Sequence, residues 1–260
     1  MVPPWVPDPV PPNPLPVPPQ QPSPAPAAPA QPPPIAPKGR FRGARLHLGN
    51  FAHGGNGREM RRGLRDYVRS GYGGRATAVR RFGGTVATAD ALHGALSAVA
   101  AGRPAAPGSA LDPALLAGRS AREVMDAVVE AVRPPDGTQD AEASRAAIRD
   151  ALSELLTMFP NADLLNLTDD QRAAVIERFV ALDVFRRTAL DVGKTIQDKA
   201  PTATVGAGRL KEVKEYIKQT VAAAFRKLRN AGNRITAGRV AEVVRDALAE
   251  TFQVFEAYVR

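Results

Sequence analysis

Residues 168–185 read TDDQRAAVIERFVALDVF, and they carry the clearest folding signal in the chain. Thr168 and Gln171 are three residues apart, which is the capping-box arrangement that opens an α-helix. Apolar side chains then recur at the three- and four-residue spacing of one buried helix face. These positions are Val175, Ile176, Phe179, Val180, Leu182, Val184 and Phe185. The pattern predicts a long helix, with Gly193 as its stop or kink.

The same helical periodicity extends over most of the chain after Arg75, and no alternating run is long enough to indicate a strand. The first expected helix covers 76–100, with an interruption at Gly83-Gly84. The next runs from the Ser120–Glu123 capping box to Pro134, and the one after it from a Thr138 cap to just before Pro160. Further helices are expected at 209–230 and from a Thr236 cap to the C-terminus. We predict an all-α, bundle-like domain of five to seven helices around one core, preceded by a disordered tail.

Composition divides the chain into three zones, 1–37, 38–84 and 85–260. The first zone holds 18 of the 25 prolines, and because proline fixes φ and lacks a backbone donor, we expect an extended tail without a core. The tail contains the only tryptophan, Trp5. We interpret Trp5 as a docking anchor for a partner or for the body of this protein. The alternative is a solvated side chain without a role.

The second zone is a basic, glycine-rich neck. Between Lys38 and Arg81 there are twelve basic residues against only Glu59 and Asp66, whereas 82–260 is balanced in charge. A short amphipathic helix is predicted near 58–69, with an arginine-rich face suited to phosphate or carboxylate groups. A merely solvated face is the alternative. The candidate partner-binding residues are Trp5, Arg40, Arg42, Arg45, Arg58, Arg61, Arg62, Arg65, Arg69, Arg80 and Arg81.

Motifs for chemistry are sparse. The chain has no cysteine and three histidines without a metal-ligand spacing, so we expect no metal, no cofactor and no enzymatic activity. The loop Gly54–Gly57 resembles a phosphate-binding loop only loosely, because it lacks the Gly-Lys-Ser/Thr ending. Acidic residues near 163–170 are accounted for by the helix dipole. Without a signal peptide or an apolar run of about 20 residues, the expected location is the cytoplasm.

Several motifs in order resemble the QatB family, a component of the four-gene Qat anti-phage defence system of bacteria. They are Val-Pro-Pro-Trp at 2–5, Arg-Phe-Arg-Gly-Ala-Arg at 40–45, Leu-Gly-Asn-Phe at 48–51, Leu-Arg-Asp-Tyr-Val-Arg-Ser at 64–70, Gly73-Gly74 and Ala-Val-Arg-Arg at 78–81. The resemblance is strongest over 2–85. Beyond that it rests on helix content and on Leu-Ala-Gly-Arg-Ser at 116–120.

The resemblance implies a non-enzymatic subunit whose partners are an ATPase, a protein similar to the enzyme that makes the base preQ0, and a TatD-like nuclease. We expect the helical body to bind the ATPase, and the tail and neck to contact another component. Family members begin with a short Gly- and Ser-rich leader, whereas here Met1 directly precedes Val2. We hypothesise that the protein similar to the preQ0 enzyme modifies the glycine of this leader, in which case the present chain would not be modified at that position. The alternative function is a nucleic-acid-binding module that contacts phosphates through the neck.

Overall fold

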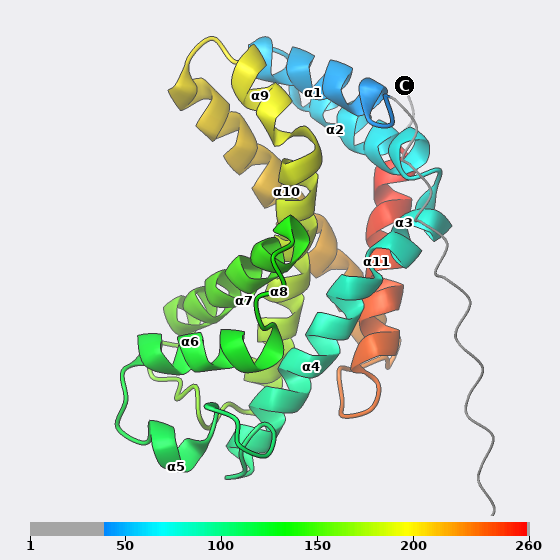
Figure 1. Ribbon diagram of the computed structural model, residues 1–260. Helices are drawn as coiled ribbons and strands as arrows, with labels where there is room; N and C mark the ends of the chain where they lie inside the picture. Colours follow the sequence, from blue (N-terminus) through cyan, green and yellow to red (C-terminus); the bar gives the residue numbers. More distant parts are fainter. Residues whose placement is uncertain (1–38, 259–260) are drawn as a thin grey trace, which may run out of the picture. The chain divides into compact units, whose positions relative to one another are not determined.

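The computed structural model describes residues 39–258, so the predictions for Trp5 and the proline-rich tail lie outside the described residues. The described part contains helices and no strand, which confirms the all-α class. Figure 1 shows α1 (Arg42–His53), α2 (Gly57–Asp66), the π-helical turn η1 (Tyr67–Gly71), α3 (Arg75–Arg81), α4 (Gly83–Ala100), α5 (Pro113–Leu116), α6 (Ala121–Val132), α7 (Gln139–Met158), α8 (Asp169–Thr188), the π-helical turn η2 (Ala189–Gly193), α9 (Lys194–Lys199), α10 (Ala203–Asn230) and α11 (Val240–Glu256).

Three predicted helix starts are confirmed by their caps. Ser120 and Thr168 each form a reciprocal capping box, with Glu123 and Gln171 respectively, and the Thr138 hydroxyl accepts from the backbone N–H of Ala141. In each case a side-chain oxygen satisfies an N–H group that the first helical turn leaves without a partner. Helices α6, α7 and α8 therefore begin where local sequence places them.

Other boundaries differ from the prediction. Helix α11 begins at Val240 without a side-chain cap, so the Thr236 cap was wrong. The Thr236 carbonyl instead accepts from the N–H of Arg239 in a turn that includes Gly238 at φ +81°. The helix predicted at 209 begins at Ala203, because Thr202 caps it. Gly193 was predicted as a stop or kink, and it is no stop, because the helical course continues through η2 into α9. Regular α-helix is nevertheless interrupted there, since the π-helical turn η2 ends at Gly193.

More helical segments are found between residues 39 and 258 than the five to seven predicted, partly because the neck itself is helical. Helix α1 was not predicted, since glycines lower the propensity of an isolated helix. Close contact between α1 and α2 explains why glycines stand in these two helices. A Cβ on Gly63 of α2 would lie 2.5 Å from Leu48 of α1, and one on Gly43 would lie 2.7 Å from Asp66. The glycines thus allow α1 and α2 to approach closely.

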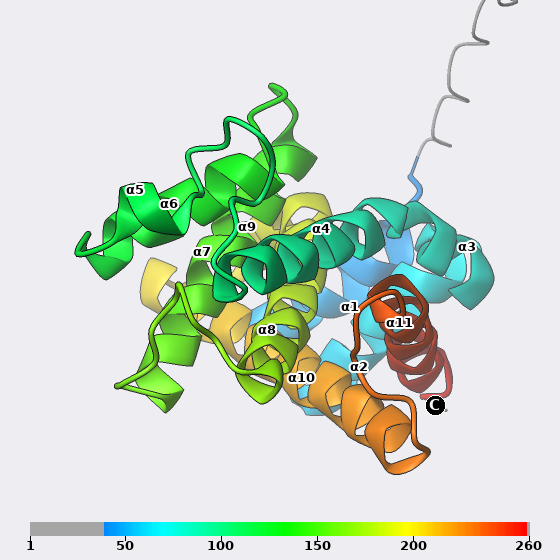
Figure 2. The same cartoon turned by 90° about the horizontal axis from the view of Figure 1, so that it is seen from below.

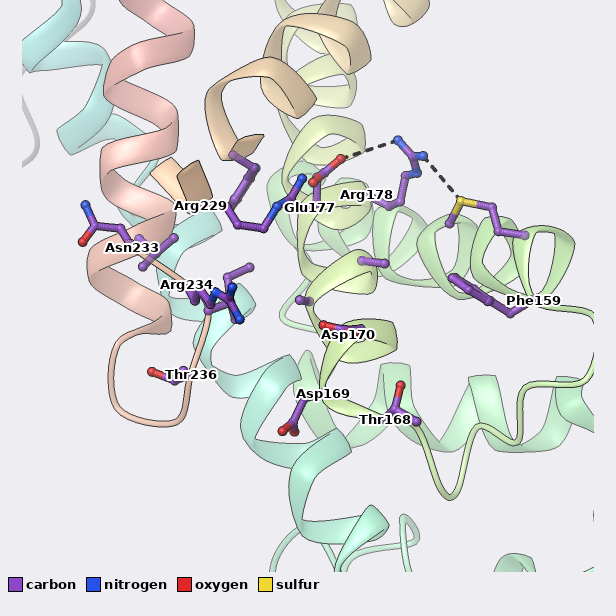
Figure 3. Close-up of a pocket in the computed structure, with 16 residues that line it drawn as sticks. Phe159, Thr168, Asp169, Asp170, Glu177, Arg178, Arg229, Asn233, Arg234 and Thr236 are labelled. Atoms are coloured by element: carbon purple, nitrogen blue, oxygen red, sulfur yellow. Dashed lines mark hydrogen bonds and ion pairs between the residues drawn. The ribbon is translucent and has the colours of Figure 1, made fainter. Parts of the chain in front are cut away.

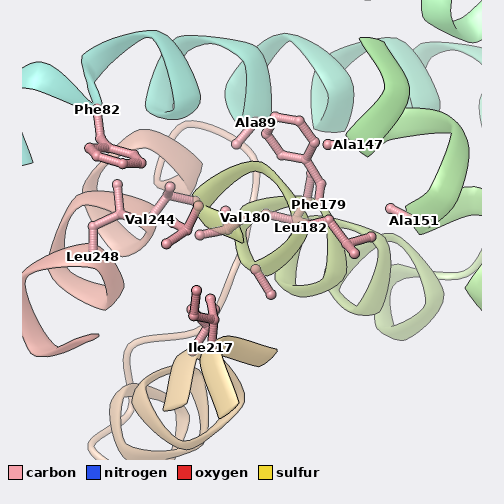
Figure 4. Close-up of a cluster of buried hydrophobic side chains, with 14 of the residues drawn as sticks. Phe82, Ala89, Ala147, Ala151, Phe179, Val180, Leu182, Ile217, Val244 and Leu248 are labelled. Atoms are coloured by element: carbon pink, nitrogen blue, oxygen red, sulfur yellow. The ribbon is translucent and has the colours of Figure 1, made fainter. Parts of the chain in front are cut away.

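Helix α8 lies at the centre of the packing. It contacts α7, α10 and α4, and α4 in turn contacts α11; Figures 1 and 2 show these helices around α8. Figure 4 shows side chains from several of these helices meeting, among them Phe179 and Leu182 of α8, Ile217 of α10 and Leu248 of α11. All four are fully buried. The apolar stripe at 175–185 therefore forms the middle of the core.

The neck packs onto this core within the compact unit Lys38–Arg260. Helix α1 contacts α9, while α2 and α3 contact α11. The predicted apolar face of the neck helix is confirmed, since Met60, Leu64, Tyr67 and Val68 are buried. Burial of these side chains removes apolar surface from water, which stabilises the fold by roughly 25 cal/mol for each Å² buried.

A buried carboxylate joins three of the central helices. Asp183 of α8 is completely buried. Its Oδ2 accepts from the Thr85 hydroxyl at 2.5 Å and from Nε of Arg187 at 3.0 Å, and its Oδ1 accepts from the Ser144 hydroxyl at 2.6 Å. Thr85 belongs to α4 and Ser144 to α7. A buried charge of this kind is tolerated because it is paired and fully hydrogen-bonded.

Replacing Asp183 by alanine is expected to lower the free energy of unfolding by about 3 kcal/mol, because the buried partners of the carboxylate lose their acceptor. Asp140→Ala is the matched control. Asp140 contacts the same Arg187 guanidinium, but its side chain is 59% exposed, so its loss should cost less than about 1 kcal/mol. Urea denaturation of both variants tests this, and equal costs would contradict the role assigned to Asp183.

Candidate partner-binding surfaces

Arg40, the first of the predicted partner-binding arginines, is engaged within the chain. Its guanidinium lies 4.6 Å from the ring centre of Phe41 and 4.3 Å from that of Tyr72. Its Nε donates to the carbonyl oxygen of Gly71 at 2.7 Å. Cation–π contact and a charge-assisted hydrogen bond thus hold the start of the described chain against η1.

Beside Arg40, the two π-helical turns meet through an acidic and a phenolic side chain. Tyr67 of η1 donates to Oδ2 of Asp191 in η2 at 2.8 Å, and Tyr72 donates to the same oxygen at 3.2 Å. Burial raises the pKa of Asp191, although both hydroxyls act in the opposite direction. Burial also raises the pKa of Tyr72 to about 12 and that of Tyr67 well above its ordinary value. This cluster ties the neck to the end of α8.

The raised pKa of Asp191 predicts a pH dependence of stability. The folded protein binds the proton more tightly than the unfolded chain, so the contribution of Asp191 is complete below the ordinary aspartate pKa of about 3.9 and is lost as pH rises through the raised value. The free energy of unfolding of the parent protein minus that of Asp191→Asn should therefore fall over this window. Urea titrations from about pH 3.5 to 8 measure it, and a difference that rises with pH would contradict the prediction.

Several other neck arginines also have partners on the same chain. Arg62 contacts Glu59 at 2.9 Å, and Arg65 contacts Asp66 at 2.9 Å. Glu59 in addition meets Nδ1 of His47 at 2.8 Å, and this hydrogen bond lowers the pKa of Glu59. The His47 contact joins α2 to α1, whereas the Arg62 and Arg65 pairs lie within α2. The charges of these two arginines are therefore balanced by acidic residues of the same helix.

The remaining predicted arginines are distributed over the neck. Arg61 lies over the ring of Tyr258 at 5.0 Å, and Arg45 donates to the carbonyl oxygen of Asp191 at 3.1 Å. Arg80 is exposed and donates to the Thr77 hydroxyl. Of the predicted arginines that the structure describes, six are exposed and form no ion pair: Arg42, Arg45, Arg58, Arg69, Arg80 and Arg81. They lie on four different elements, α1, α2, η1 and α3.

A groove on the helical body was not predicted from the sequence. It has a volume of about 910 Å³, and Figure 3 shows its lining side chains. They come from the end of α7, the first half of α8, the end of α10, the loop before α11 and the first turn of α11. Met158 and Phe159 at one side are each 41% exposed. The small side chains of Ala173 and Ala174 also line it. The groove thus combines apolar surface with a volume in the range of binding sites.

Charged side chains of both signs line the groove. Asp169 and Asp170 extend from α8, whereas Arg229 and Arg234 come from α10 and the loop that follows it. Arg178 of α8 donates to the sulfur of Met158 at 3.5 Å and lies 3.9 Å from Glu177. Burial raises the pKa of Glu177, although neighbouring arginines act against this shift. The groove therefore has an apolar side, acidic residues on α8, and basic residues on α10 and the loop that follows it.

Two signals in the sequence pointed weakly to this groove. Phe159 follows the last helical residue of α7 and lies just before Pro160, so no helix face accounts for it. Asp169 and Asp170 are in the first turn of α8, as the helix dipole favours, but they also line the groove. Residues from α7, α8, α10 and the 231–239 loop become neighbours only through tertiary packing.

The described residues show no sign of a metal centre or of a membrane span. Between residues 39 and 258, no group of three histidine or acidic side chains is placed to hold a metal ion. None of the helices in that range is both long and apolar enough to cross a bilayer.

Comparison with known proteins gives one match. The sequence model of the family described as Qat anti-phage system associated protein QatB matches residues 73–255. No curated protein and no solved structure matches the chain. The matched region contains every residue that lines the groove, whereas most of the neck precedes it. We expected the resemblance to be strongest over 2–85. The family model instead matches the helical body and only the last part of the neck.

Proposed function

The chain belongs to the QatB family of the Qat anti-phage system, and we propose that it is a non-enzymatic subunit of a multi-protein defence complex. In this proposal the helical body binds the ATPase of the system, and the tail and neck contact another component, either the protein similar to the preQ0 enzyme or the TatD-like nuclease. In this proposal the partners carry out the enzymatic reactions of the defence system.

The groove is the observation that carries this proposal. Half-exposed Met158 and Phe159 are large apolar side chains, and aromatic residues and methionine are enriched at the centres of protein interfaces. Methionine also adapts its shape to a partner. The lining lies wholly within the region that the family model matches. A binding surface on this region suits a role that belongs to the family.

The charge pattern of the groove defines the segment that fits it. An amphipathic helix of the ATPase would place apolar side chains against Phe159 and over Ala173 and Ala174. Carboxylates on that helix would meet the arginines of α10 and the following loop, and a lysine or arginine would meet the aspartates of α8. Such complementarity fixes orientation and discriminates between partners.

The groove proposal predicts that Phe159→Asp abolishes or strongly reduces recovery of the ATPase. The tagged chain is expressed with its native gene neighbourhood, treated with nuclease and affinity-purified, and co-eluting proteins are quantified by mass spectrometry. Loss of an aromatic side chain that the partner would bury, together with introduction of a charge, should reduce recovery by about tenfold or more.

Leu115→Asp provides the matched control, because Leu115 on α5 is 64% exposed and lies outside the groove. Both variants should unfold thermally close to the parent protein. If the ATPase is recovered equally with Phe159→Asp and with the parent, the groove is not its binding site. A parent chain that elutes alone would contradict the subunit proposal itself.

Sequence-independent nucleic-acid binding by the neck is the second candidate function. Six predicted neck arginines that are exposed and form no ion pair within the described residues favour it, namely Arg42, Arg45, Arg58, Arg69, Arg80 and Arg81. If about six arginines contact phosphates, affinity for duplex DNA should fall on the order of a thousandfold between 50 and 200 mM salt. Fluorescence anisotropy with DNAs of unrelated sequence measures this slope, and affinity that is independent of salt would exclude the neck as a phosphate-binding surface.

A further inference from the structure

A second cavity, of about 690 Å³, lies where α1 meets α9. Figure 1 shows these two helices at its upper edge. Its volume is within the range of small-molecule sites. Arg45, His53 and Lys199 line it together with Leu46 and Asn50. None of the described side chains that line it is acidic. The three basic side chains come from two helices that are far apart in the sequence, so only the fold brings them together.

The basic side chains of this cavity have no carboxylate among its described lining residues. Several basic residues elsewhere on the body do have acidic partners, as in Lys194 with Asp198 at 3.0 Å, Lys218 with Glu154 at 2.9 Å and Lys227 with Glu250 at 2.6 Å. Basic groups that share a cavity repel each other unless a negative charge lies between them. A bound anion would supply that charge.

The glycine loop at the edge of the cavity does not supply the anion contacts. The N–H of Gly55 donates to the carbonyl oxygen of Asn50 at 2.9 Å, and the N–H of Gly54 donates to Phe51. A Cβ on Gly55 would lie only 2.7 Å from that Asn50 oxygen, and Gly54 has a φ of +135°. These glycines therefore close the end of α1, and any anion must be bound by side chains.

The side chains are suited to a phosphate group. Arg45 uses one donor on the carbonyl oxygen of Asp191, which orients the guanidinium and leaves other N–H donors available. The stem of Lys199 packs beside Gly49, where an added Cβ would lie 3.3 Å from its Cγ. Lysine and arginine form charge-assisted hydrogen bonds with phosphate oxygens. Leu46 is 60% exposed and offers apolar surface beside them.

We propose that this cavity binds a small phosphorylated anion with at least two negative charges, such as a nucleoside diphosphate. Arg45, Lys199 and His53 would contact the phosphate oxygens, and Leu46 would contact the nucleoside. The site is separate from the groove on α7, α8 and α10, so a ligand here would leave the groove open to a protein partner.

Isothermal titration of the full chain at about 50 mM salt, where charge is weakly screened, with ADP, pyrophosphate and adenosine tests the proposal. ADP and pyrophosphate are expected to bind, and adenosine is not. Tighter binding of ADP than of pyrophosphate would identify a nucleotide as the ligand, whereas equal binding would identify a simple phosphate compound. Failure of both to bind at millimolar concentration, or equal binding of adenosine, would overturn the proposal.

Two variants locate the binding. Lys199→Met keeps the aliphatic stem beside Gly49 but removes the charge, and His53→Ala removes an exposed ring. Each should weaken ADP binding about tenfold, the effect of one lost hydrogen bond to a charged group. Lys194→Ala is the control, because Lys194 on the same helix is 85% exposed and is paired with Asp198. Equal affinity of Lys199→Met and Lys194→Ala would overturn the assignment of the cavity.

Discussion

The buried carboxylate of Asp183 constrains how the central helices can be arranged. A negative charge without solvent must be met by donors in fixed positions, and those donors are Thr85 of α4, Ser144 of α7 and Arg187 of α8 itself. Apolar packing alone would permit several rotations of one helix against another. The directional hydrogen bonds favour the arrangement in which all three donors converge, and this arrangement sets where the groove and the neck can form.

The neck is attached to this core by a second polar cluster. The π-helical turns each contain an extra residue per turn, a geometry that is rare and often found at functional positions. Here the turns bring Tyr67 and Asp191 together, while Arg40 is held between two aromatic rings. The positive charge of the neck is consequently divided between contacts that fold the protein and arginines that remain exposed. A net charge computed from composition does not distinguish these two uses.

The two cavities suit different ligands because their linings differ. The groove combines exposed apolar side chains with charges of both signs, as protein interfaces do. The smaller cavity at α1 and α9 is lined by basic groups without a carboxylate among the described residues. A subunit with both sites would bind a protein and a small anion independently, which is a suitable property for a component that joins other proteins in a defence complex.

The sequence by itself determined the all-α class, the caps at Ser120, Thr138 and Thr168, and the apolar stripe of α8, because these depend on residues only a few positions apart. Motif order also indicated the family. Tertiary structure decided the rest: α1 forms despite its glycines through contact with α2, Thr236 caps no helix, and Arg40 binds within the chain. Both cavities likewise combine residues from distant segments, so local patterns do not reveal them.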